Sequence, residues 1–260
     1  MYDFDIEKPA TVAEAVAALA AEDTQALGGG QTLIPTLKQR LASPSALVSL
    51  TAIPEMQGIS REGPTLRIGG GVTHAEVAAD GTYPALSSLA ARIGDPAVRN
   101  RGTIGGSIAN NDPAACYPAA ALASGATIVT NAREIVADDF FLGMFETALD
   151  EGEIVTAVSF PIPKAANYQK FEQPASRFAL VGVFVAKSDD GVRVAVTGAS
   201  NNGVFRWSEA EAALSDRFDA AAVEGLTVAA DEMISDLHGT AEYRAHLVRV
   251  LTGRAVAAAG

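Results

Sequence analysis

Two glycine-rich segments constrain the fold of this chain more than any other feature of its sequence. The first is 27–35, Leu-Gly-Gly-Gly-Gln-Thr-Leu-Ile-Pro, and the second is 99–112, Arg-Asn-Arg-Gly-Thr-Ile-Gly-Gly-Ser-Ile-Ala-Asn-Asn-Asp. Glycine lets a backbone turn tightly and approach a ligand closely, and successive N–H groups then bind anionic oxygens. We therefore expect both segments to be loops that close on one diphosphate-containing ligand.

Neither segment matches a common nucleotide-binding motif. No lysine follows the first run of glycines, as a Walker A loop requires, and the spacing differs from that of a dinucleotide fingerprint. A triple glycine alone is more often a simple tight turn, and a polar glycine-rich stretch alone is often a surface connection. The prediction of a binding site therefore depends on the two segments acting together.

Composition excludes several classes of partner. The chain has 260 residues, enough for one large domain or two to three small ones. Its formal net charge of −12 argues against nucleic acid or an anionic membrane, because both require a basic face. The sequence contains no apolar run long enough for a membrane span, and its first residues are acidic rather than typical of a signal peptide. These features predict a cytoplasmic protein.

A single cysteine and three histidines limit the metal chemistry of the chain. Cys116 alone forms no intrachain disulfide and cannot hold an iron–sulfur cluster that needs four thiolates. The histidines stand at no recognised zinc spacing, so we expect no metal site here and assign any metal chemistry to another polypeptide. A buried, inert thiol is the favoured interpretation of Cys116, because its immediate sequence neighbours are not basic.

Hydrophobic periodicity divides the chain into three parts, with expected boundaries at 1–55, 56–163 and 164–260. The first part is predicted as a small α/β unit, in which Thr11 and Glu14 form a capping box and the first glycines join a strand to a helix. The second starts with a hairpin over 59–68 and ends at two prolines, Pro161 and Pro163. In the third we expect strands over 168–171, 179–186 and 192–196, followed by a helical region from Ser208 onward.

These motifs resemble the FAD-binding medium subunit of the molybdenum hydroxylases, the carbon monoxide dehydrogenase and xanthine dehydrogenase family. The family's first motif, approximately Ala-Gly-Gly-Gln-Ser-Leu-Ile-Pro, matches residues 28–35. Its second, Val-Arg-Asn before Gly-Thr-Ile-Gly-Gly, matches 98–100 and 102–106, and residues 243–251 resemble its closing helix. The resemblance covers essentially the whole chain.

The resemblance implies an α+β fold. Two N-terminal α/β subdomains would form an FAD-binding domain of the vanillyl-alcohol-oxidase (PCMH-like) type. The C-terminal domain would be of the carbon monoxide dehydrogenase flavoprotein type, with a three-stranded antiparallel sheet and helices. The implied cofactor is FAD, and the residues implied to bind it are Leu27, Gly28, Gly29, Gly30, Gln31, Thr32, Leu33, Gly102, Thr103, Ile104, Gly105, Gly106, Ser107, Asn110, Asp112, Cys116, Val155 and Lys170.

One position departs from the family pattern. Many relatives carry an acidic residue two positions before the proline that opens the next helix, and this residue binds the cofactor chain. Here that position is Cys116, followed by Tyr117 and Pro118. Because a thiol is a weak hydrogen-bonding group, this anchor is expected to be missing or to be supplied by Asp112.

The resemblance further implies that the chain is one subunit of a larger enzyme. A large molybdopterin-binding subunit would oxidise the substrate, a small subunit with two [2Fe–2S] clusters would carry the electrons, and FAD in this chain would pass them to an external acceptor. The assembly would be a dimer of heterotrimers, and no residue of this chain would be catalytic toward the primary substrate. Two alternatives stay open: a self-contained FAD-dependent oxidoreductase of the same fold family, and a non-catalytic FAD-binding or assembly protein.

Overall fold

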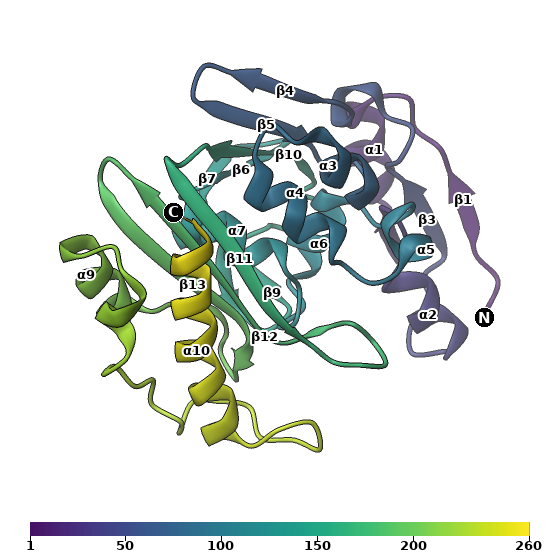
Figure 1. Cartoon of the computed structure of the whole chain (residues 1–260). Helices are drawn as coiled ribbons and strands as arrows, with labels where there is room; N and C mark the ends of the chain where they lie inside the picture. The colour runs from purple at the N-terminus through teal and green to yellow at the C-terminus, as the bar shows by residue number, and fades with distance from the viewer. Residues whose placement is uncertain (260) are drawn as a thin grey trace.

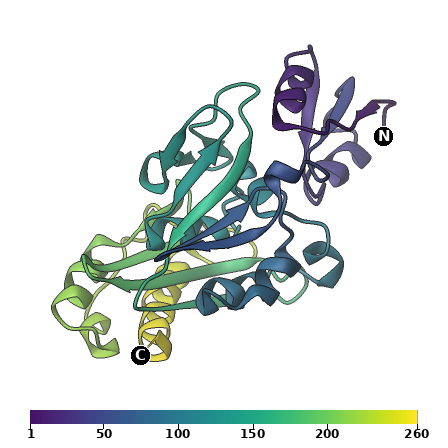
Figure 2. The same cartoon turned by 90° about the horizontal axis from the view of Figure 1, so that it is seen from above.

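The chain forms three main β-sheets that follow one another along the sequence. The computed structural model describes residues 1–259 (Figure 1). The N-terminal part is set apart from the C-terminal helix, and the middle of the chain lies between them (Figure 2). Because each main sheet is formed by one continuous part of the chain, we propose the domain limits 1–55, 56–163 and 164–260. The mixed α+β fold expected from the sequence is confirmed.

The first sheet is parallel, with the strand order β1-β3-β2. Its strands and helices are β1 (Asp5–Glu7), α1 (Val12–Leu19), β2 (Thr24–Leu27), α2 (Leu33–Lys38) and β3 (Ala46–Ser49). Thr11 caps α1 by accepting a hydrogen bond from the Glu14 N–H at 3.1 Å, as predicted. Glu14 itself accepts from the Ala10 N–H rather than from Thr11. The strand β1 was not expected, because three residues carry no readable periodicity.

The second sheet has five antiparallel strands in the order β4-β5-β10-β6-β7. The strands are β4 (Ile59–Glu62), β5 (Thr65–Gly69), β6 (Thr127–Thr130), β7 (Glu134–Val136) and β10 (Val155–Pro161). A separate hairpin consists of β8 (Phe141–Gly143) and β9 (Glu146–Thr147). The helical segments are η1 (Pro54–Met56), α3 (His74–Asp80), α4 (Pro84–Ala91), α5 (Pro96–Arg99), α6 (Ile104–Asn110), α7 (Tyr117–Ser124) and α8 (Ala137–Phe140).

The third sheet is antiparallel and contains four strands, one more than expected. They are β11 (Ala165–Glu172), β12 (Ala179–Ser188), β13 (Gly191–Ser200) and β14 (Gly203–Arg206), paired in that order. The added strand β14 has only four residues, too few to show strand periodicity, and it follows a tight turn in which Gly203 has a φ of 86°.

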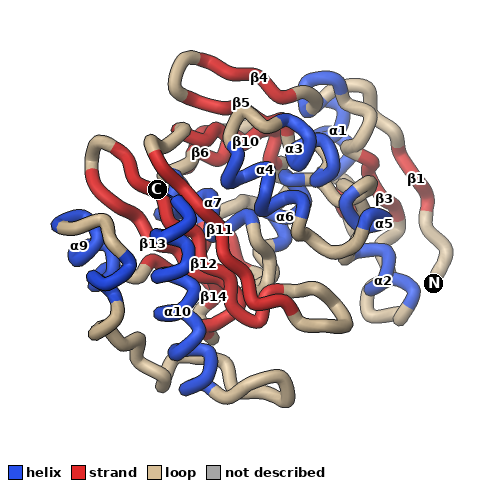
Figure 3. The backbone as a smooth tube through the Cα atoms, in the orientation of Figure 1, coloured by secondary structure: helices blue, strands red, loops and turns tan. Residues whose placement is uncertain are grey.

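The C-terminal helices are α9 (Ser208–Asp216), η2 (Ala220–Val223) and α10 (Ala241–Ala259). Helix α10 lies along the sheet formed by β11, β12 and β13 (Figure 3). The expected helical character from Ser208 onward is correct for these segments but wrong for residues 224–240, which are mostly turns and irregular backbone. That segment carries Gly225 and Gly239, which weaken a helix.

The second and third parts share a hydrophobic core. Residues 117–123 of α7 are all buried, and they pack in one cluster with side chains of β10 and of the third sheet, including Tyr168 and Phe184. A second cluster lies between the third sheet and α10. The shared core fixes the position of the third sheet against the loop that precedes α7, and this loop forms part of the cavity described next.

Candidate FAD-binding site

A cavity of about 630 Å³ lies where all three parts of the chain meet. Both glycine-rich segments line it, and so does every predicted site residue except Ile104. The side chain of Ile104 is fully buried in the core and supports the second glycine segment from beneath. The structure thus brings together residues that are more than 140 positions apart, from Leu27 to Lys170.

The first glycine segment offers a row of unused hydrogen-bond donors. Across residues 1–259, no acceptor lies within hydrogen-bonding reach of the backbone N–H groups of 28–33. The turn is closed instead by the Ile34 N–H, which donates to the Gly30 carbonyl at 3.1 Å, while Gly30 adopts a φ of 70°. Consecutive N–H groups that line a cavity form a binding surface for an anion.

The second glycine segment is different from what was expected. Residues 104–110 form the helix α6 rather than a loop, and Thr103 caps it by accepting from the Gly106 N–H at 3.2 Å. The N–H of Ile104 donates to Val72 and that of Gly105 to Gly70, both at 3.0 Å. These amides are therefore already paired inside the protein. Buried Ile104 and its neighbours stabilise the helix despite its two glycines, because burial outweighs their low helix propensity.

Glycine is required where the two segments cross. A Cβ on Gly29 would collide with the carbonyl oxygen of Arg101, and a Cβ on Gly105 would lie 2.6 Å from the carbonyl oxygen of Gly70. Gly106 is different: it is exposed to the cavity, and a Cβ there would meet only the Thr103 hydroxyl, at 3.0 Å. Gly29 and Gly105 therefore serve close packing, whereas Gly106 faces the space in which a ligand would lie.

The wall formed by residues 112–116 is held by the third sheet. The single proton of the Thr197 hydroxyl has two carbonyl oxygens within reach, those of Pro113 at 2.8 Å and Ala115 at 2.7 Å, and the Gly198 N–H donates to Pro113 at 2.7 Å. Asp112 is engaged locally, because its carboxylate accepts from the Ala114 N–H at 2.8 Å. Cys116, the last residue of this wall, is buried, as expected from the sequence.

Lys170 brings a buried cation to the cavity. Its side chain is 7% exposed, and its Nζ donates to the carbonyl oxygen of Arg92 at 2.9 Å. Arg92 in turn donates to the carbonyl oxygen of Lys170 at 2.8 Å and pairs with Glu172 at 2.9 Å. An ammonium group has three N–H donors, so Lys170 retains hydrogen-bonding capacity for a ligand. Val155, at the start of β10, adds buried apolar surface to the same cavity.

His74 also lines the cavity. It is 5% exposed, its Nδ1 has no hydrogen-bond partner among residues 1–259, and its ring centroid lies 5.3 Å from that of Tyr117. Burial, with a smaller contribution from the positive charge of Arg99, lowers the pKa of His74 to about 4. The only sequence signal that could have pointed to His74 was its position directly after Thr73, the cap of α3.

This neutral histidine predicts a pH dependence of stability. Between pH 6.5 and 4 the unfolded chain binds a proton at His74 that the folded chain does not, so stability should fall as the pH decreases through this range. Replacing His74 with glutamine should remove that contribution, which is at most roughly 3 kcal/mol. Urea unfolding of both proteins from pH 7.5 to 4 measures the difference. Parallel curves for the two proteins would contradict the burial of a neutral imidazole.

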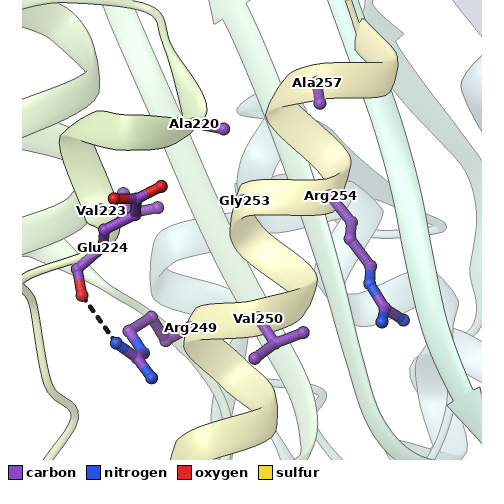
Figure 4. A pocket seen from close by; sticks show the side chains of 8 residues that line it. All are labelled: Ala220, Val223, Glu224, Arg249, Val250, Gly253, Arg254 and Ala257. Atoms are coloured by element: carbon purple, nitrogen blue, oxygen red, sulfur yellow. Dashed lines mark hydrogen bonds between the residues drawn. The ribbon is translucent and has the colours of Figure 1, made fainter.

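A second hollow of about 390 Å³ lies between η2 and α10, far from the glycine segments in sequence (Figure 4). Val223, Val250 and Gly253 contribute to its walls. Arg249 donates to the carbonyl oxygen of Glu224 at 2.6 Å and so joins the two helices. This arrangement accounts for the hollow as part of the packing of the C-terminal domain.

Comparison with known proteins identifies the class to which this fold and site belong. The family model described as the FAD-binding domain in molybdopterin dehydrogenase matches residues 2–163. The chain is therefore a member of the family of FAD-binding medium subunits of molybdenum hydroxylases, and its cofactor is FAD. The family and the cofactor expected from the sequence are confirmed.

Individual relatives cover nearly the whole chain. The nicotine 6-hydroxylase medium subunit of Paenarthrobacter nicotinovorans is 34% identical, over 97% of this chain and 95% of the relative. The carbon monoxide dehydrogenase medium chain of Hydrogenophaga pseudoflava is 32% identical, over 98% and 96%. The solved structure of quinoline 2-oxidoreductase from Pseudomonas putida 86 superposes with a TM-score of 0.88 at 31% identity, over 99% of this chain and 96% of its own. The protein is thus similar to oxidoreductase subunits throughout.

No helix in 1–259 has the length and apolar character needed to cross a membrane. In the same range, no group of three or more His, Cys, Asp or Glu side chains is placed to hold a metal ion.

Proposed function

We propose that this chain is the medium subunit of a heterotrimeric molybdenum hydroxylase and that its FAD lies in the 630 Å³ cavity. The observation that carries the proposal is that the six residues 28–33, whose N–H groups have no hydrogen-bond partner in 1–259, line a cavity shared with Gly106 and Ser107. A diphosphate requires several convergent donors and little side-chain bulk, and this surface supplies both.

The other lining residues would hold the remainder of the cofactor. Lys170 would place a positive charge beside it, while Asn110, Asp112 and Cys116 would contact it along the wall held by the third sheet. Val155 would exclude water from one side, because it is only 4% exposed and belongs to a fully buried stretch of β10. Ile104 would act indirectly, by supporting the helix that carries Gly106.

Bound FAD would accept electrons singly from [2Fe–2S] clusters and release them in pairs to an external acceptor. The clusters would belong to a small partner subunit and the molybdenum–pterin cofactor to a large one, in a cytoplasmic dimer of heterotrimers. No side chain of this chain would act on the primary substrate. The choice of substrate would instead be made by the large subunit, in line with relatives that are named for substrates as different as nicotine and carbon monoxide.

Absorption spectroscopy of the purified chain tests this proposal. We expect flavin bands, or their appearance on titration, with one FAD per chain and no hydroxylase activity. Addition of the reduced [2Fe–2S] subunit should bleach the flavin. Substrate oxidation by the isolated chain would show a self-contained oxidoreductase instead, and a bound flavin that the partner never reduces would show a non-catalytic binding protein.

A further inference from the structure

His74 is a buried histidine whose ring makes no hydrogen bond within the part of the chain that the structure describes. Buried polar groups in folded proteins are almost always hydrogen-bonded, so each exception requires an explanation. A histidine that is buried only to support the fold would be expected to have a partner inside the protein. The unpaired imidazole of His74, which lines the cavity, therefore points to a partner that binds there.

The backbone of His74 is held firmly at the start of α3. Thr73 forms a capping box with Glu76: the Glu76 N–H donates to the Thr73 hydroxyl at 3.3 Å, and the Thr73 N–H donates to the Glu76 carboxylate at 2.8 Å. The N–H of His74 donates to the carbonyl oxygen of Gly102 at 2.9 Å, which joins this helix start to the second glycine segment. The imidazole is thus carried by a well-supported backbone.

Two neighbours determine where the imidazole ring lies. The ring of Tyr117, which is fully buried, lies against it with the ring planes inclined at 50°. Gly102 packs so closely that a Cβ there would lie only 2.5 Å from Nε2 of His74. Any other residue at position 102 would therefore displace the imidazole. This glycine leaves the space that the histidine occupies beside the cavity.

The two ring nitrogens of His74 have different surroundings. Nδ1 is enclosed by protein and has no partner in 1–259. Nε2 is not enclosed in this way, and it lies against Gly102, which also lines the cavity. Nε2 is therefore the ring nitrogen that a ligand in the cavity can reach.

The tautomer of His74 follows from this difference. Burial and the positive charge of Arg99 lower the pKa of His74 to about 4, so at neutral pH the ring has one N–H donor and one lone pair. A buried N–H without an acceptor is rarer in proteins than an acceptor with unused capacity. The lone pair therefore belongs at the enclosed Nδ1 and the hydrogen at Nε2. The cavity gains one neutral donor, in addition to the amides of 28–33 and the ammonium group of Lys170.

We propose that His74 is a further FAD-binding residue, whose Nε2–H donates a hydrogen bond to an acceptor atom of the cofactor. This inference rests on the proposed function, because it requires FAD in this cavity. It goes further in naming a binding residue outside both glycine segments, the atom through which it binds and the tautomer that it adopts.

The test replaces His74 with methionine or with glutamine in the full chain and measures FAD binding by isothermal titration at pH 7.5. Methionine fills a similar space without a donor, so the dissociation constant for FAD should rise roughly tenfold. Glutamine carries an amide N–H near the position of Nε2, so its FAD affinity should stay within about threefold of the wild type. The His74→Met apoprotein should unfold within about 4 °C of the wild type, because the imidazole has no internal hydrogen bond to lose.

His238→Met is the matched control, since His238 is exposed and lies outside the cavity lining; its FAD affinity should equal that of the wild type. Undiminished FAD affinity in His74→Met would overturn the proposal. So would equal weakening in His74→Gln, which would show that the shape of the ring matters rather than its donor, and so would a large loss of stability in the His74→Met apoprotein, which would show a structural histidine. A wild-type chain that binds no FAD would instead overturn the proposed function, and this inference with it.

Nitrogen NMR of the chain with isotope-labelled histidines gives a readout that does not depend on affinity. The His74 signals are identified by their absence from the spectrum of His74→Gln. We expect an unprotonated Nδ1, a protonated Nε2, and a change in the Nε2 signal when FAD is added. A protonated Nδ1, or an Nε2 signal that FAD leaves unchanged, would contradict the proposed hydrogen bond.

Discussion

Replacing Gly106 with aspartate should weaken FAD binding by roughly 100-fold, because like charges placed together cost several kcal/mol. Gly106 lines the cavity next to Gly28, in the segment 28–33 whose N–H groups are unpaired, and a Cβ added to Gly106 meets only the Thr103 hydroxyl. The new carboxylate would therefore lie next to the cofactor's diphosphate. Folding should be little affected, because an acidic residue in the first turn of a helix such as α6 is favourable.

Two comparison variants separate this effect from a loss of structure. Gly225→Asp introduces the same side chain at an exposed glycine with no atom near its Cβ, and should leave FAD affinity unchanged. Gly105→Asp should instead lower the stability of the apoprotein, because its Cβ would press against the backbone of Gly70. Isothermal titration with FAD and thermal unfolding of the three apoproteins give both quantities. Undiminished FAD affinity in Gly106→Asp would place the diphosphate elsewhere.

All the site residues that the sequence predicted, except Ile104, line this cavity, whereas the loop expected over residues 104–110 is a helix. Glycine at 28–30, 102, 105 and 106 reflects a local requirement for small residues, which is visible without a structure. Whether such a segment becomes a loop or a helix depends on how its apolar side chains pack against the rest of the protein. Burial of Ile104 and Ile108 produced α6, and no property of residues 102–107 alone reveals that burial.

Residues that reach the site through tertiary contacts were harder to predict. His74 belongs to the cavity because Gly102 packs against its ring, a contact between residues 28 positions apart that periodicity cannot show. The role of Asn111 was also hidden, since its hydrogen bonds connect α6 to a hairpin more than 30 residues later. Lys170 and Val155 were found only through the family resemblance, because an isolated lysine or valine in a strand carries no sign of a ligand.

The third sheet shows why a distant arginine matters to this site. Arg244 in α10 is 2% exposed, and its Nη1 donates to the carbonyl oxygens of Leu180 and Gly198, each at 2.7 Å. Its Nη2 binds both carboxylate oxygens of Asp236 at 2.8 Å. Gly198 is also the residue whose N–H holds Pro113 in the cavity wall. Arg244 thus fixes the end of β13 that positions this wall.

Replacing Arg244 with methionine should therefore destabilise the protein by about 3 kcal/mol, because the two carbonyl groups stay buried without donors. For a domain of this size, that corresponds to a decrease of roughly 6–12 °C in the unfolding temperature. FAD affinity should also fall, because the wall at 112–116 loses part of its support. The control is Arg254→Met: Arg254 is exposed on the same helix, so its replacement should change neither the stability nor the FAD affinity. Calorimetry of the apoproteins and FAD titration of both variants measure these effects. Normal FAD affinity in an Arg244→Met protein of lowered stability would show that the third sheet holds the cavity wall without help from α10.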